Sequence, residues 1–258
     1  MPDLTPDAAR GWIDRWERQQ EVYLPDREER FTILLDALEA GAGRKDPVVL
    51  DLGCGPGSLS VRLLDRLPDA TVQAIDADPV TLTLGRAAYQ DRPGLHFNDL
   101  DLSTPGWSAG LPGPADAAVS TTALHWLTES QLHALYTELA TVLRPGGLLL
   151  DGDHLRSSEA TAPTLTRLER TLEEREDQRR YPGGHPEDWT AWWDAVAADP
   201  GLAAEVAERD RRRVESTHHA WSETVLLETH VGALRAAGFA EVGTLWQRGG
   251  NRLLCAVR

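Results

Sequence analysis

The 258-residue sequence is poor in cysteine, in basic residues and in long apolar runs, and each shortage excludes a class of protein. Two cysteines, Cys54 and Cys255, cannot form the disulfide framework of a small secreted domain. The formal net charge of −15 argues against a nucleic-acid substrate, because phosphate backbones require a basic surface. No stretch is long and apolar enough to span a membrane, and no N-terminal apolar segment indicates secretion. We therefore expect a cytoplasmic protein without a membrane partner.

What the sequence does contain is a glycine-rich turn within VVLDLGCGPGSLS, residues 48–60. The apolar run before the turn predicts a buried strand of a parallel sheet, and the apolar spacing after Ser58 predicts a helix. A strand, a glycine turn and a helix are typical of the start of a nucleotide-binding βαβ unit. The third glycine comes one residue earlier than in the dinucleotide fingerprint G-x-G-x-x-G, which argues against a nicotinamide dehydrogenase.

The pattern D-x-G-x-G-x-G resembles the first motif of the class I methyltransferases, which use S-adenosylmethionine (SAM). In that family the loop wraps the methionine end of the cofactor, and the acid helps to place it. The resemblance thus implies SAM as the cofactor and five contacts to it: Asp51, Gly53, Cys54, Gly55 and Gly57. For this motif taken alone, a βα turn with spare glycines and a dehydrogenase are the alternative interpretations.

A second acid, Asp76, supports a nucleoside ligand. It follows a strand predicted over 71–75, roughly 20 residues beyond the turn, where a carboxylate accepts hydrogen bonds from ribose hydroxyls. Ala77, beside it, is a further candidate contact to the cofactor. Asp78 instead suits the start of the next helix, because Pro79 fits the first helical position.

The third predicted strand covers residues 95–102 and contains two candidate adenine contacts. Members of the family commonly have an acid here that takes the adenine amino group, followed by an apolar residue that packs on the ring. Two registers fit this pattern, Asp99–Leu100 and Asp101–Leu102. We prefer Asp101–Leu102, because residues 103–107 then leave the strand as the loop.

A fourth strand, predicted over 115–120, ends at Ser120 and runs into the sequence ALHWL. We expect Ser120 near the cofactor. The ALHWL sequence resembles small-molecule methyltransferases of the trans-aconitate and ubiquinone type. His125 within it lies at the carboxyl edge of the sheet, where open α/β folds bind their ligands. It is a candidate general base or a wall of the SAM pocket, and a histidine that caps the loop is the alternative.

Later landmarks extend the resemblance. The sequence LRPGG at residues 143–147 ends a helix and precedes a strand at 148–150. Near the C-terminus, a helix capped by Ser222 and ending at Gly238 precedes a closing hairpin over 239–257. Several motifs in the right order are more specific than any one of them.

Together these features predict an α/β fold: a Rossmann-like, seven-stranded, mostly parallel sheet with helices on both faces and a helical lid insertion. We expect an N-terminal helical cover over 1–45. The SAM-binding core then comprises 46–154 and 222–258, and the insertion, which forms the lid and substrate region, is 155–221.

The two segments outside the common core hold candidates of their own. In the N-terminal cover, Tyr23 and Arg27 are candidates to contact the SAM carboxylate or an acidic substrate, with packing as the alternative. In the insertion, Trp189, Trp192 and Trp193 share one helix face. They form either an aromatic wall of the substrate pocket or, as we prefer, the lid's own core.

Histidines also follow the fifth strand and close the insertion. His154 and His219 are, with His125, the candidate catalytic bases. Asp151 and Asp153 join them as conceivable metal ligands, but no spacing demands a metal, so none is predicted.

We therefore expect a SAM-dependent methyltransferase that acts on an O, N or C nucleophile of a small molecule in specialised metabolism, as a monomer or homodimer. In-line placement of nucleophile, methyl and sulfur supplies most of the acceleration. The alternatives are a SAM-binding enzyme of this fold with a different reaction, a Rossmann-type dehydrogenase, and a non-catalytic cofactor-binding regulator.

Overall fold

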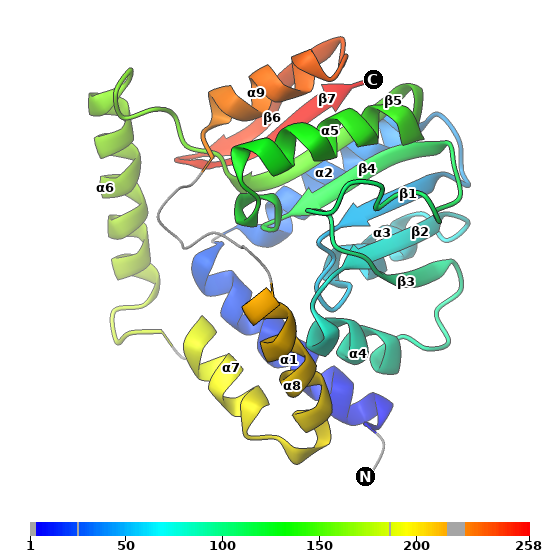
Figure 1. The fold of residues 1–258 in the computed structure, drawn as a ribbon. Coiled ribbons are helices and arrows are strands. Elements are labelled where there is room, and N and C mark those ends of the chain that lie inside the picture. The colour runs from blue at the N-terminus through cyan, green and yellow to red at the C-terminus, as the bar shows by residue number, and fades with distance from the viewer. Residues whose placement is uncertain (1–3, 25, 186, 216–224) are drawn as a thin grey trace.

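The computed structural model describes residues 4–24, 26–185, 187–215 and 225–258, and a seven-stranded sheet forms its centre (Figure 1). The strand order is β3-β2-β1-β4-β5-β7-β6, with β7 antiparallel to both of its neighbours and the other pairs parallel. The predicted fold class is confirmed. The strands are β1 (Val48–Leu52), β2 (Thr71–Asp76), β3 (Leu95–Asp99), β4 (Ala115–Thr121), β5 (Leu143–His154), β6 (Glu241–Arg248) and β7 (Asn251–Val257).

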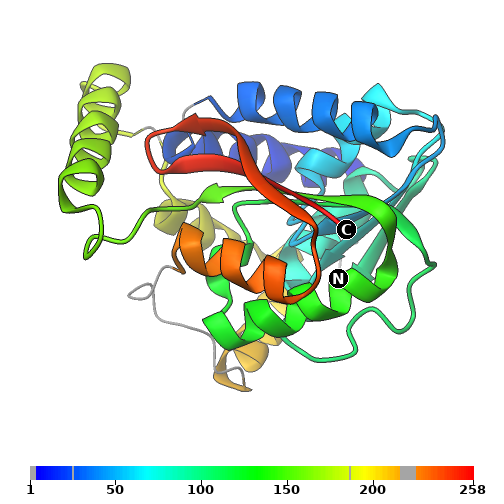
Figure 2. The same cartoon turned by 90° about the horizontal axis from the view of Figure 1, so that it is seen from above.

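Helices cover both faces of the sheet (Figure 2). Helices α5 and α9 pack on one face, and α2 and α3 pack on the other. In the described ranges, none of the helices combines the length and apolarity needed to cross a bilayer. The helices are α1 (Pro6–Tyr23), α2 (Arg27–Ala42), α3 (Ser58–Arg66), α4 (Pro79–Ala88), α5 (Glu129–Val142), α6 (Pro163–Arg180), α7 (Trp189–Ala197), α8 (Ala203–Glu215) and α9 (Leu227–Ala236), with 3-10 turns η1 (Leu124–Trp126) and η2 (Pro200–Leu202).

The apolar run of β1 explains why both faces need a cover. Val49 belongs to the core beneath α2 and α3, whereas Leu50 and Leu52 belong to the core beneath α5. All three side chains are buried, and burial of such a side chain stabilises the fold by about 1.5–3 kcal/mol. The central strand is thereby fixed, and its carboxyl end is held where the glycine turn begins.

The insertion does not pack as one unit. Helix α7 packs on α1 and helix α8 on α4, while α6 stands apart from the sheet (Figures 1 and 2). Trp192 is fully buried between α1 and α7, beside Ile13 and Val80. Trp192 is therefore a core residue, but this core is shared with α1 and α4 and is not the lid's own.

Three element boundaries differ from the sequence prediction. Strand β3 ends at Asp99 rather than at residue 102. Strand β5 begins at Leu143, inside the LRPGG sequence, because Leu143 pairs with Ala115 before a register irregularity. Helix α9 begins at Leu227, and Ser222 lies outside the described residues.

Candidate functional site

The glycine turn lies at the carboxyl end of β1, between β2 and β4, which is the point where the strand order reverses. Gly53, Gly55 and Gly57 have φ angles of +69°, +55° and +92°, which side chains rarely tolerate. A Cβ on Gly53 would lie 2.3 Å from the Cβ of Ala123, and one on Gly57 would lie 2.8 Å from Cζ of Phe97. The turn therefore requires glycine for close approach to its neighbours as well as for its backbone angles.

Asp51, the acid before the turn, is fully buried on the last residues of β1. Its Oδ2 accepts a hydrogen bond of 2.5 Å from Ser60 Oγ, whereas its Oδ1 is buried without a partner. Burial and the nearby Asp76 carboxylate raise the pKa of Asp51 to about 7, against the Ser60 hydrogen bond. Oδ1 of Asp51 can therefore accept a hydrogen bond from a ligand bound at the turn.

Asp76 ends β2 and holds the turn from the other side. Its Oδ2 accepts a 2.7 Å hydrogen bond from the backbone N–H of Gly55, and its Oδ1 accepts one of 2.8 Å from the N–H of Asp78. Burial, followed by the Asp78 charge, raises its pKa to about 6. Asp78 itself caps α4, as the sequence predicted, through Val80 N–H and Thr81 N–H.

The two candidate adenine acids have different partners. Asp99 binds the guanidinium of Arg212 on α8 through two contacts of 2.7 and 2.9 Å. Asp101 lies in the loop after β3, where its Oδ1 accepts a 2.8 Å hydrogen bond from the N–H of Ser103. Leu102 is partly buried against the α5 core. The same Arg212 donates to the carbonyl of Ala77 at 2.8 Å, so α8 closes this end of the sheet.

Two other predicted contacts are buried structural groups in this structure. Ser120 is fully buried, and its Oγ donates to the carbonyl of Leu52 at 2.9 Å, which ties β4 to β1. Cys54 is buried within the turn, and burial raises the pKa of its thiol well above the ordinary value. Ser120 thus supports the turn from β4, and Cys54 supports it by packing against Ala74 and Leu82.

Tyr23 and Arg27 lie on the N-terminal helices and have partners within the protein. The hydroxyl of Tyr23, a side chain that is 40% exposed, accepts a 2.9 Å hydrogen bond from the N–H of Trp189. The guanidinium of Arg27 pairs with Glu17 and lies 4.6 Å from the ring centroid of Phe31. Tyr23 thus joins α1 to α7 of the insertion, whereas Arg27 joins α2 to α1.

His125 forms a dyad with Asp153. The ring Nδ1 lies 2.9 Å from Oδ1 of Asp153, a fully buried carboxylate near the end of β5. Burial alone would lower the pKa of His125, but the Asp153 charge and hydrogen bond raise it above the ordinary value. Burial likewise opposes the Asp153 carboxylate, yet His125 lowers its pKa below the usual range. The His125 side chain keeps 20% of its surface exposed.

Further titratable groups lie near the dyad. The third candidate base, His219, lies outside the described residues. Nδ1 of His154 is buried without a partner, and burial lowers the pKa of this histidine. Asp151 is fully buried, and neither of its carboxylate oxygens accepts a hydrogen bond. Burial and the Asp153 charge raise the pKa of Asp151 well above its ordinary value. His230, 3.9 Å from Asp151, bonds to the Tyr136 hydroxyl at 2.7 Å. Within the described part of the chain, no three His, Cys, Asp or Glu residues are grouped so as to hold a metal ion.

Arg30 on α2 is a charged residue of this region that the sequence analysis missed. It is fully buried, and it donates at 2.6 Å to both Asn251 Oδ1 and Thr121 Oγ1. Burial lowers its pKa to about 10, against the attraction of Asp153. A signal was present, because Arg30 occupies the same helix face as Leu34.

Aromatic rings connect the turn to the dyad. Trp16 Cζ2 lies 3.6 Å from the position that a Cβ of Gly55 would occupy. The Trp16 ring contacts Trp189, with centroids 5.4 Å apart, and Trp189 lies 6.4 Å from Trp126. Trp126 lies 5.1 Å from the His125 ring. The sequence analysis did not identify Trp16 or Trp126 as parts of the site.

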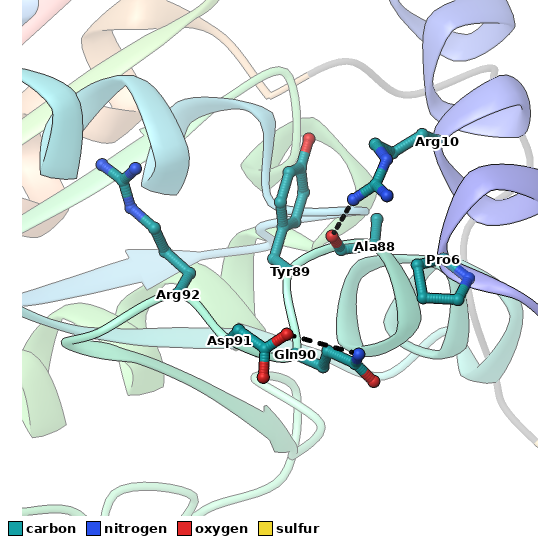
Figure 3. Close-up of a pocket in the computed structure, with 7 residues that line it drawn as sticks. All are labelled: Pro6, Arg10, Ala88, Tyr89, Gln90, Asp91 and Arg92. Carbon is teal, nitrogen blue, oxygen red and sulfur yellow. Dashed lines mark hydrogen bonds between the residues drawn. The ribbon is translucent and has the colours of Figure 1, made fainter.

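A separate cavity of about 320 Å³ lies between α1 and the end of α4 (Figure 3). Arg10 crosses it to donate to the carbonyl of Ala88 at 3.1 Å. Because α4 runs back from the carboxyl edge of the sheet, this cavity belongs to the opposite edge. Its lining residues are Pro6, Arg10, Ala88, Tyr89, Gln90, Asp91 and Arg92.

Comparisons with known proteins agree with this geometry. The methyltransferase domain family matches residues 49–147, from the glycine turn to the LRPGG sequence. A trans-aconitate 2-methyltransferase of Azoarcus sp. (strain BH72) is 34% identical over 135 residues, which are 52% of this chain and 49% of that protein. The homologue from Mycobacterium ulcerans (strain Agy99) is 34% identical over 153 residues, 57% of this chain and 53% of that protein. The chain thus spans about half the length of the curated relatives it matches.

The likeness to solved structures lies in the fold. Human N-acetylserotonin methyltransferase in complex with SAM aligns with a TM-score of 0.54 at 17% identity. The alignment covers 94% of this chain and 56% of that one. The matched domain includes the turn that Asp51 and Asp76 enclose.

Proposed function

We propose that this chain, whose residues 49–147 match the methyltransferase domain family, is a class I SAM-dependent methyltransferase that transfers a methyl group from SAM to a small molecule. The observation that carries the proposal is the glycine turn at residues 53–57, held between Asp51 and Asp76 where the strand order reverses. Open α/β folds bind their ligands in the crevice at such a point. The trans-aconitate 2-methyltransferases among its relatives also act on a small acceptor, as their name states.

The residues of the turn fit the cofactor. The unpaired Oδ1 of Asp51 offers a buried acceptor at the methionine end. Asp76 already binds backbone N–H groups, and each carboxylate oxygen retains a lone pair for a ribose hydroxyl. For the adenine amino group we propose Asp101 rather than Asp99, because Arg212 already occupies both oxygens of Asp99. When bound, SAM supplies an electrophilic methyl group on sulfur.

We further propose His125 as the general base. With its Nδ1–H directed to Asp153, the neutral ring has its lone pair on Nε2, which can accept a proton from the nucleophile. A buried carboxylate that fixes the tautomer is a recurrent arrangement for a histidine base. Since a neutral amine reacts without a base, the dyad favours an oxygen or carbon nucleophile. We also propose His154 as a second candidate base, and Tyr23 and Arg27 as candidate contacts to the SAM carboxylate. The proposed setting is specialised metabolism.

Calorimetric titration of the purified protein with SAM, S-adenosylhomocysteine and NAD tests the proposal. We expect both sulfur nucleosides to bind in the micromolar range and NAD not to bind. The matched variants Asp101→Asn and Asp99→Asn separate the two adenine registers, because Asp101→Asn should weaken SAM binding more than Asp99→Asn, which only breaks the ion pair with Arg212. NAD binding without SAM binding would contradict the proposal in favour of hydride transfer.

A further inference from the structure

We propose that the methyl acceptor is a flat aromatic molecule with a hydroxyl group, and not a carboxylate of the kind that the trans-aconitate enzymes are named for. This inference rests on the proposed function and defines the acceptor for the same site. Three independent features support this inference: an aromatic wall, the His125–Asp153 dyad, and nearby arginines that already bind acidic or polar groups of the protein.

The aromatic wall consists of Trp16, Trp189 and Trp126, which lead from the glycine turn to His125. Successive ring centroids are 5.4 and 6.4 Å apart, and the planes of Trp189 and Trp126 differ by only 31°. All three rings are partly exposed, in contrast to the fully buried Trp192 behind them. The Trp16 plane is tilted by 56° from that of Trp189, so the partly exposed rings offer both faces and edges to a flat apolar molecule.

The dyad indicates what the nucleophile carries. An acceptor carboxylate is already ionised at neutral pH, so a base adds nothing to its reactivity. A phenolic hydroxyl has a pKa of about 10, and its oxygen becomes a strong nucleophile only as its proton leaves. The pairing of His125 with the buried Asp153 supplies such a base.

Charge at this edge of the sheet also disfavours an anionic acceptor. Among the described arginines around the site, Arg27 is paired with Glu17, and Arg30 is fully buried with its Nη atoms engaged. On α8, Arg209 and Arg212 bind Asp78 and Asp99. The carboxylates of Asp51, Asp76 and Asp153 lie at the same edge, and like charges at close range repel.

The reaction that follows is balanced without a further reactant. The acceptor hydroxyl gives its proton to Nε2 of His125 while its oxygen forms a bond to the methyl carbon. The carbon–sulfur bond breaks and leaves its electron pair on sulfur, which gives the methyl ether and S-adenosylhomocysteine. The imidazolium is stabilised by Asp153 until its proton passes to water.

Two probes with the same ring test the inference: 2-naphthol and 2-naphthoate, titrated calorimetrically into protein saturated with S-adenosylhomocysteine. We expect 2-naphthol to bind at least about tenfold more tightly, a difference of about 1.4 kcal/mol. Trp126→Leu should weaken 2-naphthol binding about fivefold or more and leave S-adenosylhomocysteine binding unchanged. Trp246→Leu, on the distant strand β6, is the matched control and should change neither.

Equal or tighter binding of 2-naphthoate would overturn the inference, as would a failure of both probes to bind. So would unchanged 2-naphthol binding in Trp126→Leu. If S-adenosylhomocysteine itself does not bind, the proposed function fails first, and the two failures are thereby distinguished. With SAM present, transfer of the methyl group to trans-aconitate but not to 2-naphthol would also refute the aromatic acceptor.

Discussion

Two buried aspartates close the carboxyl ends of β1 and β5, and their surroundings give them different charges. Asp51 has one hydroxyl partner, so burial dominates and raises its pKa to about 7. Asp153 is opposed by burial too, but the facing His125 lowers its pKa below the usual range. The two carboxylates are equally buried but differ in charge. Asp51 is readily protonated, whereas Asp153 stays ionised beside His125.

Asp51→Asn should raise the free energy of unfolding of the ligand-free protein, because it removes a desolvated charge. The expected gain is about 1–3 kcal/mol. A carboxyl whose folded pKa is raised destabilises the fold fully above that pKa, here about 7, and progressively less as the pH falls toward the unfolded value of 3.8. Thermal unfolding at pH 8 and at pH 5 should therefore show the larger gain at pH 8. An equal gain at both pH values, or one reproduced by the exposed Asp69→Asn, would contradict this account.

The dyad predicts a pH profile for methyl transfer to a hydroxyl acceptor. The base must be neutral, so kcat should rise with pH and level off above the pKa of His125, which lies above its ordinary 6.5. Asp153→Asn should lower kcat by roughly 10²–10⁴ and move the acidic limb to lower pH, since burial then acts on His125 without the compensating charge.

The control for that profile is His133→Gln, because His133 is exposed on α5. It should leave both kcat and the profile unchanged. His125→Gln should remove the acidic limb, and the double variant with Asp153→Asn should be no slower than the slower single variant. Additive losses would show that the two residues do not act as a unit.

At the scale of elements, α8 fastens the insertion to the ends of β2 and β3. Arg209 binds Asp78 at 2.7 Å and lies 3.5 Å from the ring centroid of Trp193, while Arg212 binds Asp99 and the Ala77 carbonyl. These contacts place α8 beside the proposed nucleoside position. The helix therefore belongs to the cofactor side of the insertion, whereas α7 belongs to the acceptor side.

Arg212→Ala should weaken SAM binding by about threefold, because the contacts it breaks are partly exposed ion pairs worth up to about 1 kcal/mol. The loss measured by calorimetry should shrink at 500 mM salt, where the wild-type pairs are themselves screened. Arg211→Ala, which removes a guanidinium paired with Glu208 on the same helix, is the matched control. A salt-independent loss would point to direct contact between Arg212 and the nucleoside instead.

The turn and its acids could be predicted from the sequence because their geometry is local. Asp51 to Gly57 is one strand end and one tight turn, and Asp76 lies at the end of the neighbouring strand. The sequence offered Trp189 as part of an aromatic wall, but the dyad and the contribution of Trp16 and Trp126 to that wall were not predictable in this way. Asp153 lies on β5, whereas His125 lies in the η1 turn after β4. Trp16 of α1 contacts Trp189 of the insertion, whose docking no sequence periodicity specifies. A helix stripe indicates that a face is buried but does not identify its partner.

At the scale of the whole molecule, the site is built on the seven-stranded sheet from segments that are far apart along the chain. The cofactor turn, the loop after β4 and the end of β5 converge because parallel strands meet at one edge. Helices α7 and α8 of the insertion pack on α1 and α4, which lie far from them in the sequence. Ligand binding should therefore stabilise the molecule as a unit.

S-Adenosylhomocysteine at about 100 times its dissociation constant should add about 2.7 kcal/mol to the free energy of unfolding. For a chain of this size that corresponds to a rise in Tm of roughly 5–10 °C. Differential scanning calorimetry with and without the nucleoside measures the shift, and NAD at the same concentration is the control. A shift with NAD alone would contradict the cofactor assignment.

The contact between α1 and the insertion also has a consequence for synthesis on the ribosome. Trp12 donates to Asp199, 187 residues later, and the Trp192 ring packs edge-on against it. At roughly 5–20 residues per second, helix α1 must wait about 10–40 s before these partners emerge. During that interval its tryptophans have no partners, so the nascent chain presents the apolar face of an amphipathic helix to chaperones well before the molecule can close.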